Sequence, residues 1–133
     1  MEAIIRAVRA KGFETAEFAG ENPVSIGESK SRDIRFAAFQ GTVNKFAALI
    51  GVSDLYIGYD SLGQHLAAAV DRDVIAVFAG YRSDLFPERW KPLGKGAIRL
   101  VKACCGPFTL ERQDELAASV FQLYKSLRVE KSA

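Results

Sequence analysis

The stretch DLYIGYDSLGQHLAAA, from Asp54 to Ala69, decides the fold of this 133-residue chain. It begins as an apolar strand, turns at a short polar segment that contains a glycine, and continues as an alanine-rich helix. A turn that opens a helix gathers backbone N–H groups at the positive end of the helix dipole, where anions bind. We therefore predict a binding site over Asp60, Ser61, Leu62, Gly63, Gln64 and His65.

Length and composition indicate one globular domain over residues 1–133. Hydrophobic residues make up 49% of the chain, and 18 basic against 16 acidic side chains give a net charge of +2. Because the charges are balanced and scattered, we expect no nucleic-acid partner. Since no apolar run approaches the length that spans a bilayer, we expect no transmembrane segment and a cytoplasmic protein.

The two cysteines, Cys104 and Cys105, are adjacent, a spacing that does not suit a disulfide between them. With the single histidine, His65, they make a poor zinc set, so we expect no metal and no other cofactor. They also lack a nearby histidine, which argues against a thiol nucleophile. We interpret them as reduced thiols.

Helix and strand patterns alternate along the rest of the chain. Strands are predicted over 14–19, 36–39, 55–59, 74–79 and 97–103, and helices over 3–11, 42–50, 61–70 and 110–128, with a long loop over 80–96. Thr42 is the expected N-cap of its helix, with Val43 facing inward. The alternation predicts a Rossmann-like parallel sheet of about four or five strands with helices on both faces.

Two groups of residues can carry chemistry. Ser61 and the turn amides suit a phosphate, His65 suits a phosphate or ribose oxygen, and Asp60 suits sugar hydroxyls. Alternatively, the turn only caps the helix and His65 is structural. Arg89 and Trp90, in the long loop, suit a base or a diphosphate, unless the loop is simply held by one buried tryptophan. No residue is assigned as catalytic.

These residues resemble the C-terminal domain of the ADP-heptose:lipopolysaccharide heptosyltransferase family, glycosyltransferase family 9, which has the GT-B fold. That family shows a strand, then Asn-Asp-Ser-Gly-Pro-Met-His-Leu-Ala-Ala-Ala, a buried strand ending Phe-Gly, and a loop with Arg-Trp-x-Pro-x-Gly. Residues 54–69, 74–80 and 88–94 follow in that order. Residues 40–50, which include Thr42, and residues 18–20, which end at Gly20, are similar to upstream segments of the family.

The resemblance implies that this domain holds the nucleotide-sugar donor, an ADP-sugar being one candidate, for lipopolysaccharide biosynthesis. It implies that the turn contacts the donor's phosphates and sugar, with Asp60, Ser61 and His65 carried over directly. Leu62 and Gly63 depart from the family's Gly and Pro, and Tyr59 replaces its Asn. A β-carbon at residue 62 would hinder the approach of the backbone to a phosphate.

Two functions follow from this comparison. The first is the donor-binding half of a heptosyltransferase-like enzyme, catalytically incomplete as this chain because the first strand of the domain and the N-terminal acceptor domain have no counterpart in it. The second is a non-catalytic α/β module that has lost donor binding and acts through a protein partner. In either case, we expect an N-terminal domain on another chain, or self-association, to cover the exposed edge.

Overall fold

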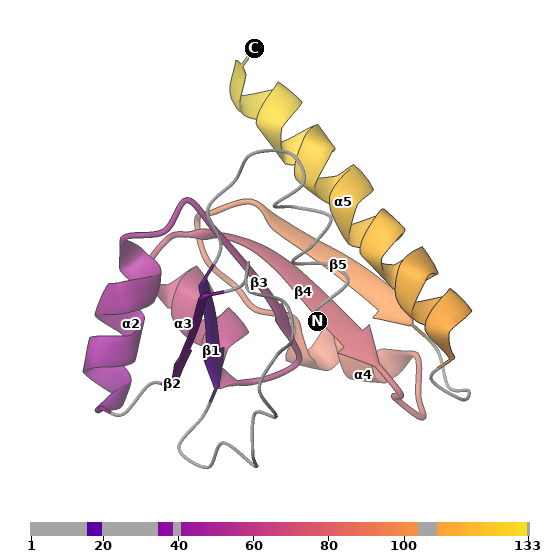
Figure 1. Cartoon of the computed structure of the whole chain (residues 1–133), viewed down its shortest axis with the longest axis horizontal. Coiled ribbons are helices and arrows are strands. Elements are labelled where there is room, and N and C mark those ends of the chain that lie inside the picture. Colours follow the sequence, from indigo (N-terminus) through magenta and orange to yellow (C-terminus); the bar gives the residue numbers. More distant parts are fainter. Residues whose placement is uncertain (1–15, 20–34, 39–40, 104–108, 133) are drawn as a thin grey trace.

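The central feature of the fold is a parallel three-stranded sheet in the order β3-β4-β5. The computed structural model describes residues 16–19, 35–38, 41–103 and 109–132 (Figure 1). The strands of this sheet are β3 (Leu55–Tyr59), β4 (Asp73–Ala79) and β5 (Ile98–Ala103). β5 lies at an edge of this sheet, and the strands are parallel, as the alternation of strands and helices predicts.

Helices cover both faces of this sheet, as the sequence predicts (Figure 1). Alternate residues of β4 face opposite sides, so Val74, Ala76 and Phe78 pack with α3 (Leu62–Ala69), while Ile75 and Val77 pack with α5 (Leu110–Ser132). Residues 73–78 are all buried, which explains the nearly continuous apolar run of this strand. The core therefore has two layers that share β4.

The first helix of the described chain, α2 (Val43–Gly51), packs on α3 rather than directly on the sheet. Its N-cap is Thr42, as predicted, and the Thr42 side chain accepts a hydrogen bond from the Lys45 amide at 3.4 Å. Ile50 is buried, but Val43 is 52% exposed, so the prediction that Val43 faces inward is wrong. Val43 is the first residue of α2, where its side chain is largely exposed.

Two further strands form a separate sheet. Strands β1 (Ala16–Ala19) and β2 (Arg35–Ala38) pair in parallel with each other. The described residues thus carry five strands in two sheets, instead of the single sheet of four or five strands that the alternation predicts. The pattern of apolar residues identifies strands, but it does not state which strands pair.

The predicted long loop over 80–96 contains a short helix, α4 (Leu85–Trp90). A proline in its first turn, Pro87, hides this helix in the sequence, because a proline inside a segment usually argues for a loop. The predicted helix over 3–11, Gly20, Cys104 and Cys105 lie outside the described residues. Within the described part of the chain, no helix has both the length and the apolar character needed to cross a membrane.

Candidate functional site

The predicted turn lies at the carboxyl end of β3, where ligands bind in open α/β sheets. The Asp60 amide extends the strand ladder by donating to the Val77 carbonyl of β4 at 3.0 Å. Ser61 is the N-cap residue of α3, but its side chain makes no capping hydrogen bond to the helix. The turn is therefore attached to β4, and the Ser61 hydroxyl does not serve as a cap.

Tyr56 supports the turn from beneath. Its ring lies so close to Gly58 and Gly63 that a β-carbon at either glycine would overlap it. Burial raises the pKa of Tyr56 above its ordinary value of 10.0, and the nearby Ser61 side chain only partly offsets that rise. Tyr56 is thus a neutral hydroxyl at neutral pH, beneath the turn and close to Ser61.

Gln64 joins the turn to α4. Its side chain is completely buried, and its Nε2 donates to Asp60 Oδ1 at 2.8 Å. The same nitrogen lies 3.4 Å from the Trp90 carbonyl and 3.4 Å from His65 Nε2. Gln64 Oε1 is buried and has no hydrogen-bond partner. Gln64 therefore positions the Asp60 carboxylate, at the cost of one unsatisfied acceptor.

A hollow of about 460 Å³ opens beside the turn, at the carboxyl ends of β3 and β4. We call it the strand-end hollow. Its walls are aromatic and aliphatic groups with one carboxylate and one guanidinium, from three segments: the end of β3, the end of β4 with the residues that follow it, and α4. The lining residues are Tyr59, Asp60, Val77, Phe78, Ala79, Gly80, Tyr81, Arg82 and Phe86. Burial raises the pKa of Tyr59, so its hydroxyl is neutral at neutral pH.

The Arg-Trp-x-Pro-x-Gly segment divides into an anchored part and an exposed part. Pro92 is fully buried, and a β-carbon at Gly94 would overlap the carbonyl of Ala68 at the end of α3. Trp90 is 55% exposed, so the alternative of a loop held by one buried tryptophan is wrong. The Trp90 ring lies 6.3 Å from the ring of Phe86, which lines the strand-end hollow. Arg89 and Trp90 do not line the hollow themselves.

Of the six predicted turn residues, only Asp60 lines the strand-end hollow. Ser61 and Leu62 are exposed, and Gly63 and Gln64 are buried beneath them. Thr42 lies outside the hollow as the cap of α2. Sequence reasoning missed Tyr81, Arg82 and Phe86. For Tyr81 and Arg82, a position just after the carboxyl end of a buried strand is the signal that would have found them.

Metal binding finds no support in the part of the chain that the structure describes, where no group of three or more His, Cys, Asp or Glu side chains is arranged to hold an ion. The turn and the strand-end hollow together carry the Asp60 carboxylate, the His65 imidazole, the Arg82 guanidinium, hydroxyl groups and backbone amides. Such a set can bind an anionic ligand that also carries hydroxyl groups.

The parallel sheet, with helices on both faces and a polar turn at the strand ends, is a Rossmann-like α/β fold. Residues 38–124 match the profile of Glycosyltransferase family 9 (heptosyltransferase). Because this match covers more than half of the chain, the chain belongs to that family. No curated protein and no solved structure shows a significant match.

Proposed function

We propose that this domain binds the nucleotide-sugar donor of a heptosyltransferase-like glycosyltransferase. The observation that carries the proposal is the position of the family's motif: residues 60–65 form the β3–α3 turn and the first turn of α3, next to the strand-end hollow. The Asp60 carboxylate accepts a hydrogen bond from a sugar hydroxyl, while Ser61 and the turn amides face the phosphates. His65, one turn into α3, donates to a phosphate or ribose oxygen.

The proposal extends to the reaction in which the donor is used. Sugar transfer in a GT-B enzyme takes place between two domains, and the proposed role of this domain is the donor side. We therefore propose that the chain alone does not transfer sugar, because positioning of the acceptor contributes about 7–11 kcal/mol to such reactions. The acceptor domain, on another chain or joined to this one, is the proposed partner. A cytoplasmic location and a role in lipopolysaccharide biosynthesis belong to the same proposal.

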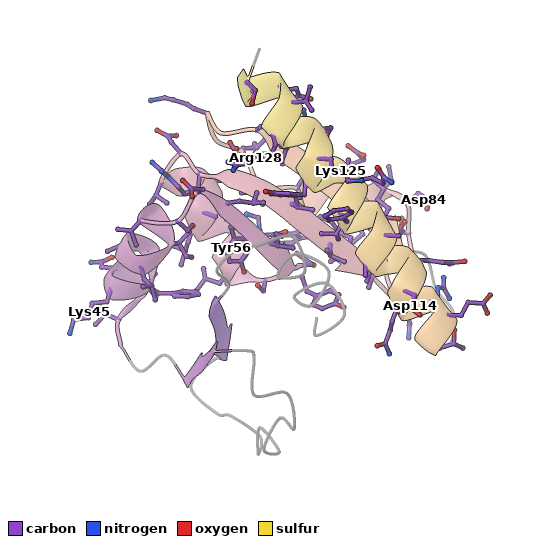
Figure 2. All side chains as sticks on the ribbon, turned by 45° about the horizontal axis from the view of Figure 1, so that its top comes forward. Lys45, Tyr56, Asp84, Asp114, Lys125 and Arg128 are labelled. Carbon is purple, nitrogen blue, oxygen red and sulfur yellow. The ribbon has the colours of Figure 1, made fainter. Side chains whose placement is uncertain are left out.

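Donor binding is tested by NMR titration of the labelled chain with ADP, GDP, UDP and their sugars. We expect shifts that centre on the amides of residues 60–65 and that shrink in the Ser61→Ala, His65→Ala double variant. The matched control is Lys45→Ala, which changes an exposed side chain on α2 (Figure 2). Shifts confined to other surfaces, or unchanged in the double variant, would contradict the assignment.

A second candidate function is a module that has lost donor binding and acts through a protein partner. Leu62 favours it, because this side chain is 56% exposed at the turn where the family has glycine. The variant Leu62→Gly separates the two functions. If Leu62 limits the approach of a phosphate, the variant binds nucleotides more tightly than the natural chain. If neither chain binds any nucleotide, the partner function is favoured.

A further inference from the structure

Two opposite charges line the strand-end hollow without pairing with each other. Asp60 comes from the end of β3, and Arg82 from the segment that follows β4. The Asp60 carboxylate accepts a hydrogen bond from Gln64. Arg82 is exposed, and within the described ranges its guanidinium makes no hydrogen bond or ion pair. The hollow thus presents an anion-binding group and a hydroxyl-binding group at the same place.

The backbone explains how Arg82 comes to the hollow. Gly80 has φ +72, the left-handed conformation that favours glycine, and its amide donates to the Ala103 carbonyl at 3.2 Å. This bond extends the β4–β5 ladder by one residue, after which the chain turns. On the other side, Phe86 of α4 packs edge-on against Phe78, with ring centroids 6.2 Å apart. The segment that carries Arg82 is therefore held at both ends.

The chemistry of the two charged groups selects a ligand. A guanidinium binds phosphate oxygens with two parallel hydrogen bonds, whereas a carboxylate accepts hydrogen bonds from hydroxyls. Val77 and Phe86 add apolar contact area to the same hollow. Leu62 stands at the turn where a phosphate would otherwise meet glycine backbone. A cationic side chain can supply the missing attraction from the opposite segment.

We propose that Arg82 binds the diphosphate of the donor in the strand-end hollow while Asp60 binds hydroxyls of its sugar. This inference rests on the proposed function and adds to it the group that recognises the anion. Substitution of Arg82 should therefore weaken the binding of ligands that carry a diphosphate and leave the binding of a nucleoside without phosphates unchanged.

The test is a titration of the full chain with ADP, inorganic pyrophosphate and adenosine, followed by NMR. Arg82→Ala is expected to weaken ADP and pyrophosphate about tenfold to a hundredfold, the effect of losing hydrogen bonds to a charged group, and to leave adenosine unchanged. Arg82→Lys is expected to fall between, because an ammonium keeps the charge but loses the planar fork. GDP and UDP replace ADP if they bind more tightly.

The matched control is Arg128→Ala. Arg128 is an exposed arginine near the C-terminal end of α5 (Figure 2), and that end of α5 points away from α4 (Figure 1). We expect Arg128→Ala to bind ADP and pyrophosphate as the natural chain does. Urea unfolding of each variant checks that the fold is kept, as expected for substitutions of exposed side chains.

Each outcome decides the proposal. Equal weakening by Arg128→Ala, or full affinity in Arg82→Ala while ADP still shifts residues 60–65, overturns the role of Arg82 and leaves the proposed function standing. Pyrophosphate binding that depends on Arg82, without any nucleotide binding, overturns the proposed function but supports an anion site at Arg82. If no probe binds the natural chain, both proposals are wrong.

Discussion

Gly63 shows at the level of a single residue why this turn differs from the family's motif. The family has proline at this position, but here a β-carbon would overlap the Tyr56 hydroxyl. The aromatic ring beneath the turn therefore requires glycine above it. The departure is explained by packing, because Gly63 makes room for the Tyr56 hydroxyl beneath the turn.

This pairing predicts a strong coupling between residues 56 and 63. Gly63→Ala should lower the free energy of unfolding by about 1–3 kcal/mol, the usual cost of overpacking. Gly63→Ala should lower the free energy of unfolding much less in a Tyr56→Leu background, where the aromatic ring and its hydroxyl are absent. Urea unfolding of the four chains measures the coupling, for which neighbouring residues typically give about 0.5–3 kcal/mol. Additive effects would contradict the overlap.

Gln64 also differs from the family, which has methionine at this position. Gln64→Met removes the hydrogen bond to Asp60, but it also removes the unsatisfied Oε1. These effects oppose each other, so we expect the free energy of unfolding to change by less than about 1 kcal/mol. Donor binding should respond differently, because Asp60 loses the group that positions it.

The readout for Gln64→Met is the ratio of two affinities. We expect the variant to bind an ADP-sugar more weakly than the natural chain does, while its affinity for ADP stays the same, because Asp60 is assigned to the sugar. Calorimetric titration of both ligands measures the ratio. An equal loss for the two ligands would indicate a general disturbance of the turn.

At the level of elements, Glu88 of α4 forms an ion pair with Lys102 of β5. Glu88 accepts hydrogen bonds from Lys102 of β5 at 2.6 Å and from Lys91 at 3.3 Å. These hydrogen bonds and the two positive charges lower the pKa of Glu88 below 4.5. The stabilisation is therefore present above the ordinary glutamate pKa and is lost as the pH falls through the lowered value. Because Glu88 is exposed, salt weakens this link.

NMR titration of the Glu88 carboxylate checks this link. We expect a midpoint below 4.5 in the natural chain at low salt, and a return toward the ordinary value in Lys102→Ala. Lys45→Ala is the control, since Lys45 lies on α2, away from α4 (Figure 2). A Glu88 midpoint that ignores both Lys102 and salt would mean that the ion pair does not form in solution.

For the molecule as a whole, the sequence predicts most strands and helices of the described residues but less of the site. The continuous apolar run over 74–79 and the long helix pattern over 110–128 predict a strand and a helix, and β4 and α5 confirm both predictions. The hollow was harder to predict, because Arg82 and Phe86 become neighbours of Asp60 only when β3 and β4 pair. The burial of Gln64 likewise depends on where α4 lies, and α4 was predicted as loop.

The two-sided burial of β4 has a consequence for how the domain opens. Because β4 is hydrogen-bonded to β3 and β5 and covered by helices on both faces, its amides should take up deuterium only when the whole domain unfolds. The amides of the exposed segment over 82–84, just after the carboxyl end of β4, should exchange within the shortest labelling times. Mass spectrometry of labelled peptides should therefore find an abrupt step in protection within a few residues after Ala79. A gradual change in amide protection there would show that the end of β4 frays. A hollow formed by a fraying strand would not hold a ligand in a fixed position.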